Sequence, residues 1–152
     1  NELLDEVVIS ASKFSQKFRE VPKKVTQINR ATIEFTNPMT SADLLERGGY
    51  VFIQKSQLGG GSPMIRGHST NRLVLSVDGV RLNNAIFRGG NIHNVISISP
   101  LNIQNTEVIM GSASVLYGSD AIGGVMNFYT KKAKLSNELS PKIKANLNTR
   151  YS

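Results

Sequence analysis

The side chains that could carry catalytic chemistry are few and scattered in this sequence of 152 residues. His68 and His93 are its only histidines, and it has no cysteine. Disulfides, thiolate metal sites and cysteine nucleophiles are therefore excluded. No serine combines with a histidine and an acid in the sequence context of a nucleophile elbow. We predict that the chain is not an enzyme, and an isolated histidine is usually structural or exposed.

Two glycine-rich stretches, residues 59–63 and 88–91, have the backbone freedom to cradle an anion. Neither follows the GxxxxGK[ST] pattern of a P-loop or the GxGxxG pattern of a dinucleotide site. We interpret both as flexible loops.

The net charge of +7 is unevenly distributed. Residues 1–30 hold six basic and four acidic side chains, residues 31–130 hold six of each, and residues 131–152 hold six basic and one acidic. A nucleic-acid groove needs a basic stripe with stacking aromatics on the folded surface, whereas here the excess lies in a lysine-rich tail. We therefore expect no nucleic-acid partner.

The sequence pattern predicts neither a membrane-spanning helix nor a signal peptide. No run approaches the roughly 20 apolar residues of a membrane helix. The first residues lack the initiator Met and the basic-then-apolar plan of a signal peptide, so we expect a processed or engineered start.

Short strands separated by glycine must position the few functional side chains. Apolar and β-branched runs predict strands at 7–11, 24–29, 105–110 and 124–130. Residues 73–77 and 80–82 flank Asp78 and Gly79, a pair that tolerates the positive φ angles of a tight hairpin turn. Residues 40–47 predict a helix that stops at two glycines, and residues 112–122 a short helix interrupted at Gly118. The fold class is α+β, with a small mixed β-sheet, short helices and long loops.

Four motifs in series resemble the plug domain of TonB-dependent outer-membrane receptors. They are MIRG at 64–67, VDGV at 77–80, EVIMGSASVLYG at 107–118 and AIGGV at 121–125. Each motif alone is weak, but their order and spacing match the family over roughly residues 5–132.

The resemblance implies a plug inside the lumen of a barrel of about 22 strands that this chain does not contain. It implies an outer-membrane location in a Gram-negative bacterium, with the plug facing the periplasm. We expect a TonB-box-like segment at 1–12, the plug at 13–132, and a linker with the start of the first barrel strand at 133–152. Residues 143–151 support the last assignment because apolar and polar side chains alternate there.

The N-terminal segment is similar to the TonB box, which the energy-transducing protein TonB grips. Its residues are Asp5, Glu6, Val7, Val8, Ile9, Ser10 and Ala11. A short β-branched run can add itself to the edge of a partner's sheet, where main-chain hydrogen bonds supply the grip. The alternative is that this run is only the first strand of the plug.

Arg66 matches a family arginine that pairs with glutamates of the barrel wall and seats the plug. Guanidinium suits this role because it is always charged and pairs bidentately. The family usually has a second arginine before the glycine of the EV motif, but this sequence has Met110 there. The resemblance therefore implies no second seating arginine in this sequence.

The transported ligand depends on apical loops, expected at 59–63 and 83–94, and on barrel loops outside this chain. Residues 80–90 resemble the haem and haemoglobin receptor branch, in which a plug histidine can ligate haem iron. Here Asn91 stands where that histidine would be, and His93 lies two positions later. Either His93 supplies the iron bond from this shifted position, with Phe87 as a stacking neighbour and Arg88 as a propionate partner, or His93 is a simple surface residue and the receptor is not a plug-ligated haem transporter. Haem would be cargo, and no resident cofactor is expected.

Three functional classes make different predictions for this chain. A transport plug is inert without its barrel and contacts TonB, a free-standing periplasmic binding domain binds ligand alone, and an enzyme turns substrate over. The box-like start and barrel-like end favour the plug. Siderophores, vitamins and oligosaccharides remain alternative ligands to haem.

Overall fold

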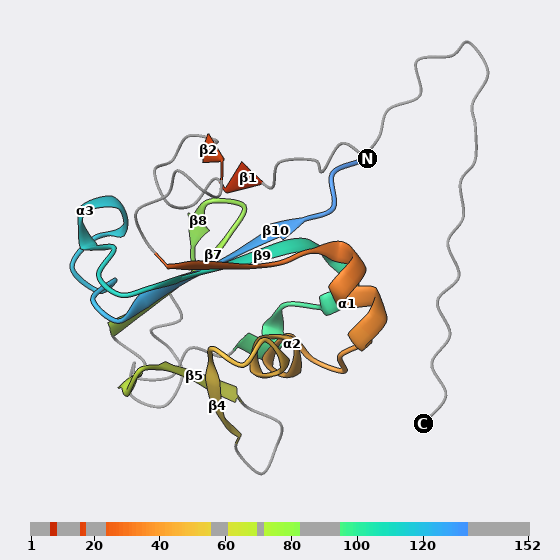
Figure 1. Cartoon of the computed structure of the whole chain (residues 1–152), viewed down its shortest axis with the longest axis horizontal. Helices are drawn as coiled ribbons and strands as arrows, with labels where there is room; N and C mark the ends of the chain where they lie inside the picture. Colours follow the sequence, from red (N-terminus) through yellow and green to blue (C-terminus); the bar gives the residue numbers. More distant parts are fainter. Residues whose placement is uncertain are drawn as a thin grey trace.

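The computed structural model describes residues 7–8, 16–17, 24–55, 61–69, 72–82 and 95–133. These residues form a small α+β fold with three separate sheets (Figure 1). The expected barrel strand at 143–151 lies outside the described residues. In the part of the chain that the structure describes, no helix is both long and apolar enough to cross a membrane.

A mixed five-stranded sheet forms the centre of the molecule. Its order is β3-β9-β10-β7-β8. The strands are β3 (Val25–Ile28), β7 (Leu73–Val77), β8 (Val80–Arg81), β9 (Ile103–Met110) and β10 (Gly124–Thr130). β10 is parallel to β7 and antiparallel to β9, while β3 forms one edge. The mixed sheet and the strands predicted around residues 24–29, 105–110 and 124–130 are confirmed, although β9 begins two residues earlier than expected.

The predicted hairpin at Asp78 and Gly79 is confirmed. Both residues have positive φ, 49° and 82°, as the tight turn between β7 and β8 requires. The Asp78 carboxylate also accepts hydrogen bonds from the backbone N–H and the hydroxyl of Thr130, at 2.9 and 2.6 Å. One aspartate therefore shapes the hairpin and holds the end of β10, 52 residues away in the chain.

Helix α2 (Ser41–Arg47) confirms the predicted helix. Thr40 and Asp43 form a capping box, in which each side chain accepts from the other residue's backbone N–H. Burial would raise the pKa of Asp43, but hydrogen bonds from Thr40 and Lys55 outweigh it and lower that pKa. The predicted helix at 112–122 is shorter than expected: α3 (Ser114–Tyr117) ends before Gly118.

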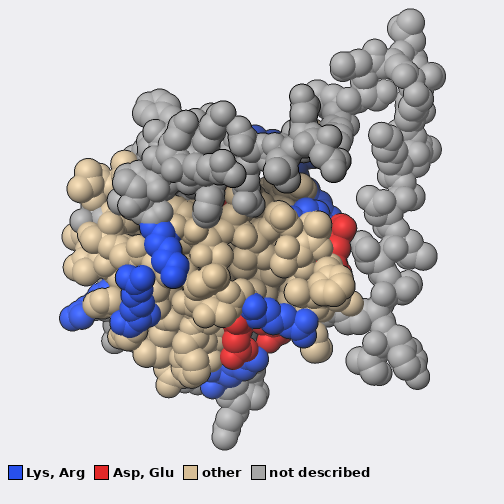
Figure 2. Space-filling view, in the orientation of Figure 1, with Lys and Arg blue, Asp and Glu red and all other residues tan. Residues whose placement is uncertain are grey.

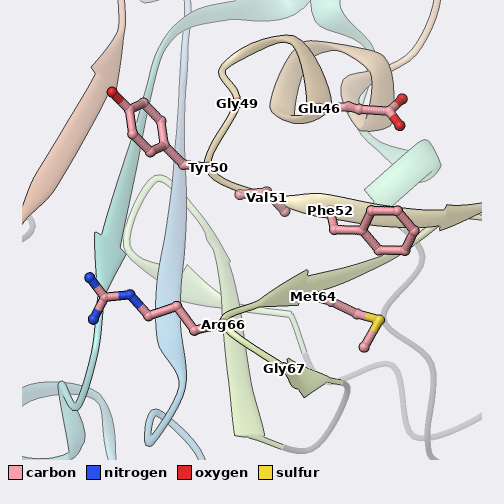
Figure 3. A pocket seen from close by; sticks show the side chains of 8 residues that line it. All are labelled: Glu46, Gly49, Tyr50, Val51, Phe52, Met64, Arg66 and Gly67. Carbon is pink, nitrogen blue, oxygen red and sulfur yellow. The ribbon is translucent and has the colours of Figure 1, made fainter.

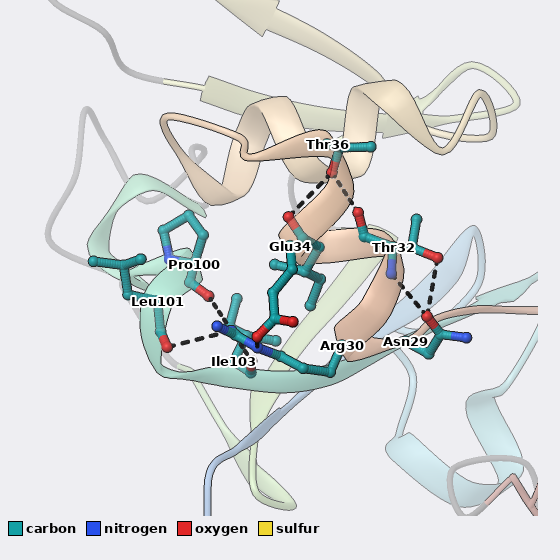
Figure 4. A network of polar contacts seen from close by, with 9 residues as sticks. Asn29, Arg30, Thr32, Glu34, Thr36, Pro100, Leu101 and Ile103 are labelled. Carbon is teal, nitrogen blue, oxygen red and sulfur yellow. Dashed lines mark hydrogen bonds and ion pairs between the residues drawn. The ribbon is translucent and has the colours of Figure 1, made fainter. Parts of the chain in front are cut away.

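Helix α1 (Arg30–Thr36) was not predicted, because its sequence has three β-branched residues and little amphipathic signal. Asn29 caps its start by accepting from the backbone N–H of Thr32 at 2.9 Å. The Arg30 guanidinium donates to the carbonyl oxygen of Ile103 at 3.0 Å and pairs with Glu34 at 2.7 Å (Figure 4). Tertiary contacts thus fix a helix that local propensity does not favour.

A second, three-stranded sheet packs beside α2. It consists of β4 (Phe52–Lys55), β5 (Gly61–Ile65) and β6 (His68–Ser69), in that order. The interpretation of residues 59–63 as a flexible apical loop was wrong for Gly61 onward. A Cβ on Gly61 would lie 3.0 Å from side-chain atoms of both Ala42 and Ile53, so this glycine is required by packing.

The five-stranded sheet buries both of its faces. Helices α1 and α2 lie on one side, while β1 (Val7–Val8) and β2 (Gln16–Lys17) lie on the other (Figure 1). The larger core fills the helix side, and a smaller apolar cluster lies on the opposite face. Its members include Val25, Val74, Ile109 and Val125, which are cross-strand neighbours in the sheet.

Charged side chains are dispersed on the face shown in Figure 2. Several Lys and Arg side chains lie near one another at the left of this view, and others lie beside acidic groups. Two such contacts link α2 to β4, because Lys55 Nζ pairs with Asp43 at 3.1 Å and with Glu46 at 2.8 Å. Among the described residues drawn there, the basic side chains form no continuous stripe on this face.

Candidate functional site: the N-terminal strand, the Arg66 turn and a buried polar row

The segment predicted to bind TonB is described only at Val7 and Val8, which form β1. β1 pairs antiparallel with β2, Val7 opposite Lys17 and Val8 opposite Gln16. These two strands form a sheet of their own, not joined to the central one. Asp5, Glu6, Ile9, Ser10 and Ala11 lie outside the described residues. The predicted extended conformation is therefore present at the centre of the segment.

Arg66 occupies the tip of the hairpin between β5 and β6. Its φ is 49° and that of Gly67 is 79°, which are the positive values of a primed two-residue turn. A non-glycine residue with positive φ is uncommon. The turn presents the Arg66 side chain outward, and this side chain is exposed. The sequence analysis singled out Arg66 by resemblance but did not predict its turn.

Arg66 borders a shallow hollow of about 490 Å³ between β4, β5 and the end of α2. The hollow is lined by Glu46, Gly49, Tyr50, Val51, Phe52, Met64, Arg66 and Gly67. Arg66 and Tyr50 extend toward one side of it, and Phe52 and Met64 toward the other (Figure 3). Lys24 Nζ lies over the Tyr50 ring, 5.4 Å from its centroid. An arginine, two aromatic rings and a methionine therefore gather on one surface.

Met110 stands at the position where a second seating arginine is usual. Its side chain is buried in the larger core together with Val108 and Met126. An arginine there would bring a charge into an apolar core without compensation, which is strongly unfavourable. In this chain the position serves packing instead of seating.

The residues expected to contact ligand are Phe87, Arg88, Asn91 and His93, and all lie outside the described residues. The other histidine, His68, is half-buried in β6. It packs so close to Gly123 that a Cβ on that glycine would lie 2.4 Å from His68 Cβ. Among the described residues, no group of three or more His, Cys, Asp or Glu side chains could hold a metal ion.

A row of polar side chains crosses the central sheet on the face opposite the helices. Strand register places Gln27, Glu107, Asn127, Ser76 and Arg81 in line over five adjacent strands. Glu107, Asn127 and Ser76 are almost wholly buried. On each of the strands β3, β7, β9 and β10, the residue of this row lies two positions from a residue of the smaller apolar cluster. Side chains alternate between the two faces along a strand, so the row and the cluster share a face.

Hydrogen bonds join this row to two tyrosines. Ser76 donates to Asn127, which donates to the Tyr117 hydroxyl at 2.9 Å. The Tyr129 hydroxyl donates to Glu107 at 3.4 Å. Burial raises the pKa of Tyr129 well above its usual value, and the Glu107 carboxylate raises it further. Burial also raises the pKa of Tyr117, against an opposing hydrogen bond from Asn127. Both hydroxyls therefore stay protonated at neutral pH, that of Tyr129 as a donor to Glu107 and that of Tyr117 as an acceptor from Asn127.

The sequence analysis missed this row, although its signal is visible. Asn127 interrupts the apolar run of β10, and a single polar residue inside such a run marks a buried group with partners, whereas Glu107 follows three polar residues and carries no such signal. Which strands stand side by side is not readable from local patterns, so the row itself could not be assembled.

Comparison with known proteins gives consistent matches. The family model "TonB-dependent Receptor Plug Domain" matches residues 17–125. The Vitamin B12 transporter BtuB of Vibrio vulnificus (strain CMCP6) is 40% identical over 136 residues, which cover 87% of this chain and 22% of the transporter. The chain thus spans about a fifth of the length of this curated relative.

Solved structures share the fold at lower identity. The pyoverdine outer membrane receptor FpvA from Pseudomonas aeruginosa PAO1 has a TM-score of 0.73 at 20% identity, over 84% of this chain and 18% of that receptor. The Serratia marcescens hemophore receptor HasR, a double mutant in complex with HasA and heme, has a TM-score of 0.62 at 23% identity. It covers 73% of this chain and 17% of HasR. At these identities the likeness concerns the fold.

Proposed function

Since this chain belongs to the TonB-dependent receptor plug family, we propose that it gates nutrient uptake through an outer-membrane barrel of about 22 strands. The observation that carries the proposal is the match of the plug-domain family model to residues 17–125. The region of the vitamin B12 transporter that matches this chain is only 22% of that transporter. The rest of the receptor would supply the barrel. The plug would then sit in the lumen and face the periplasm, without catalytic activity of its own.

The proposed organisation follows the sequence. Residues 1–12 bind TonB, residues 13–132 form the plug, and residues 133–152 link it to the first barrel strand. The exit from the plug is well anchored, because Asp78 holds Thr130 and the Lys131 N–H donates to the Asn102 carbonyl at 2.9 Å. This anchoring suits a chain that must stay attached to its barrel while its N-terminus is engaged.

TonB would grip the segment from Asp5 to Ala11 by adding it to a sheet edge. Val7 and Val8 are already extended in β1, which supports this mode because strand addition requires extended backbone. The two-residue pairing with β2 is short, so it offers little resistance to exchange for a partner strand.

Arg66 would seat the plug by pairing with carboxylates of the barrel wall. Replacing Arg66 with alanine in the complete receptor should weaken plug retention by roughly 2 kcal/mol, the scale of hydrogen bonds to a charged group. The measurement is the urea concentration at which the plug becomes protease-sensitive inside the folded barrel. Arg72→Ala, at another exposed arginine, is the control. Equal midpoints for Arg66→Ala and the unmodified receptor would contradict the seating role.

The cargo we propose first is haem. The support is the resemblance of residues 80–90 to haem receptors and the short sequence separation of His93 from Phe87 and Arg88. Neutral imidazole coordinates iron, while an aromatic ring and a guanidinium suit the porphyrin face and the propionates. Asn91 cannot replace imidazole at iron, so His93 is the loop residue on which the proposal depends.

Vitamin B12 is the second candidate cargo. It is favoured by the 40% identity to a vitamin B12 transporter across most of this chain. Siderophores are a third class, supported by the likeness to the siderophore receptor PiuA from Acinetobacter baumannii, at a TM-score of 0.61 and 27% identity.

Titration of the complete receptor with haem and with cyanocobalamin separates these proposals. If haem is the cargo, the haem absorption band should shift to that of a histidine-ligated iron, and His93→Ala should abolish the shift. His68→Ala is the matched control, because His68 packs within the plug beside Gly123. Saturable cobalamin binding without a haem shift would instead favour the second cargo. Binding of neither would overturn both.

A further inference from the structure

The turn between β7 and β8 places an aspartate carboxyl group next to the main-chain nitrogen of a glycine. The two residues, Asp78 and Gly79, both have positive φ, at 49° and 82°. The turn favours glycine at its second position because a side chain is strained at such a φ. The same requirement leaves the Gly79 nitrogen without a neighbouring Cβ to shield it. The fold therefore sets the least hindered kind of peptide nitrogen beside the Asp78 side chain.

This turn is open to solvent. Asp78, Gly79 and Val80 are exposed, and a Cβ built on Gly79 would meet no atom within 4 Å. In a two-residue hairpin the ladder hydrogen bonds join the residues that flank the turn, here Val77 and Val80, so the Gly79 N–H is not a ladder donor. A nitrogen nucleophile, a carboxyl carbon and water therefore meet at one exposed position.

We propose that Asp78 and Gly79 form a site of spontaneous covalent modification, at which the aspartate isomerises to isoaspartate. The Gly79 nitrogen attacks Cγ of Asp78, and a C–N bond forms as a C–O bond breaks. The leaving oxygen takes the N–H proton and one proton from solvent and departs as water. Water then opens the cyclic imide at the main-chain carbonyl carbon of Asp78, which leaves the chain connected through Cγ. The mass of the protein is unchanged, and water is the only other reactant.

Thr130 restrains this reaction in the folded chain. Its backbone N–H donates to Oδ1 of Asp78 at 2.9 Å, and its hydroxyl donates to Oδ2 at 2.6 Å. Thr130 itself is held at the end of β10 by pairing with β9. The Asp78 carboxylate must leave both donors before its Cγ can turn toward the Gly79 nitrogen. We therefore expect isomerisation to be slower in the folded chain than in an unstructured peptide of the same sequence.

The product would lose the contacts that the turn now makes. Isoaspartate adds a methylene carbon to the main chain and turns the former main-chain carboxyl into the side group. The backbone geometry of the tight turn and the hold of Asp78 on Thr130 would both be lost. The modification would thus loosen the end of β10. This inference goes beyond the proposed function and does not depend on the transported cargo.

Peptide mapping of the complete receptor tests the proposal. Trypsin cleaves after Arg72 and Arg81, so it releases residues 73–81 as one peptide. The folded receptor is incubated at neutral pH, and isoaspartate in this peptide is measured by its separate chromatographic peak and its resistance to a protease that cuts before aspartate. A synthetic peptide of residues 73–81 gives the unrestrained rate. The folded receptor should form isoaspartate at least about fivefold more slowly than this peptide.

Variants at Thr130 separate the clamp from general protection by the fold. Thr130→Val keeps the shape but removes the hydroxyl donor, so it should raise the rate about fivefold, the scale of one exposed hydrogen bond to a charged group. Thr130→Ser keeps the hydroxyl and should retain the original rate. Thr26→Val, the same change on β3, is the matched control.

Two results would overturn the proposal. One is the absence of isoaspartate from the 73–81 peptide of both the unmodified receptor and Thr130→Val. The other is an equal rate in Thr130→Val and Thr26→Val, which would show that Thr130 does not restrain the site. Transport by the unmodified receptor is measured separately, so failure of the proposed function and failure of this inference are distinguishable.

Discussion

Replacing Val8 with proline in the complete receptor should abolish uptake while ligand binding persists. Proline has no N–H and fixes φ, so it removes a main-chain donor from the middle of the segment that TonB would add to its sheet. Val8 lies in β1, where the backbone is already extended. Uptake should fall to the level of cells that lack TonB. The measurements are energy-dependent uptake of the cargo in cells and equilibrium binding to the purified receptor.

The control for this prediction comes from the partner strand. Gln16 faces Val8 in the β1–β2 pair, so Gln16→Pro perturbs the same short ladder and leaves the TonB segment unchanged. Uptake should survive Gln16→Pro. If both variants transport normally, the segment is not the TonB contact. If both variants lose uptake, the pairing of β1 with β2 matters more for uptake than the binding of TonB to this segment.

Replacing Gly124 with alanine should destabilise the chain by about 3 kcal/mol or more, the upper range for forced overpacking. The added Cβ would lie 2.6 Å from the carbonyl oxygen of Ile109 and 3.1 Å from Cδ1 of Ile65. Ile109 is held in β9 between β3 and β10, so its backbone cannot move without loss of ladder pairing. The free energy of unfolding of the 152-residue chain in urea, followed by circular dichroism, measures the effect.

Gly48→Ala is the matched control for Gly124→Ala. Gly48 has right-handed helical backbone at the end of α2, and a Cβ there would lie 3.3 Å from Cδ1 of Ile28 and 3.3 Å from the carbonyl oxygen of Leu45, against 2.6 Å from a strand carbonyl at Gly124. The end of an isoleucine side chain can shift, unlike a strand carbonyl, so this variant should change stability by no more than about 1 kcal/mol. A Gly124→Ala chain as stable as the Gly48→Ala chain would refute the explanation that close packing against Ile109 requires glycine at position 124.

Local sequence patterns were sufficient for elements whose signals are contained in neighbouring residues. The Asp78 and Gly79 turn, the capped helix α2 and the strand β10 all follow from turn chemistry, capping or alternation within a few positions. The motif series likewise identified the family, which the match over residues 17–125 confirms. The α+β class with a small mixed sheet is confirmed by the fold that the chain shares with TonB-dependent receptors.

Contacts between distant residues decided the remaining features. Helix α1 forms although its propensity is low, because Arg30 binds carbonyls 70 to 73 positions away. The glycine at position 61 of β5 reflects close packing, because a Cβ there would lie 3.0 Å from side-chain atoms of Ala42 and Ile53, and not a bend of the chain. Glu107 and Asn127 meet because β9 and β10 pair in one register.

The same distinction separates the candidate sites. The sequence alone identified Arg66 as a residue of interest, but its place at a hairpin tip beside Tyr50, Phe52 and Met64 depends on how β4 and β5 pair. Strand pairing joins residues that have no local relation in the chain, and the energy that selects one register comes from burial over the whole sheet. The sequence by itself therefore determined the family, the turn at Asp78 and Gly79, and the capped helix. Only the tertiary structure decided which side chains share a surface.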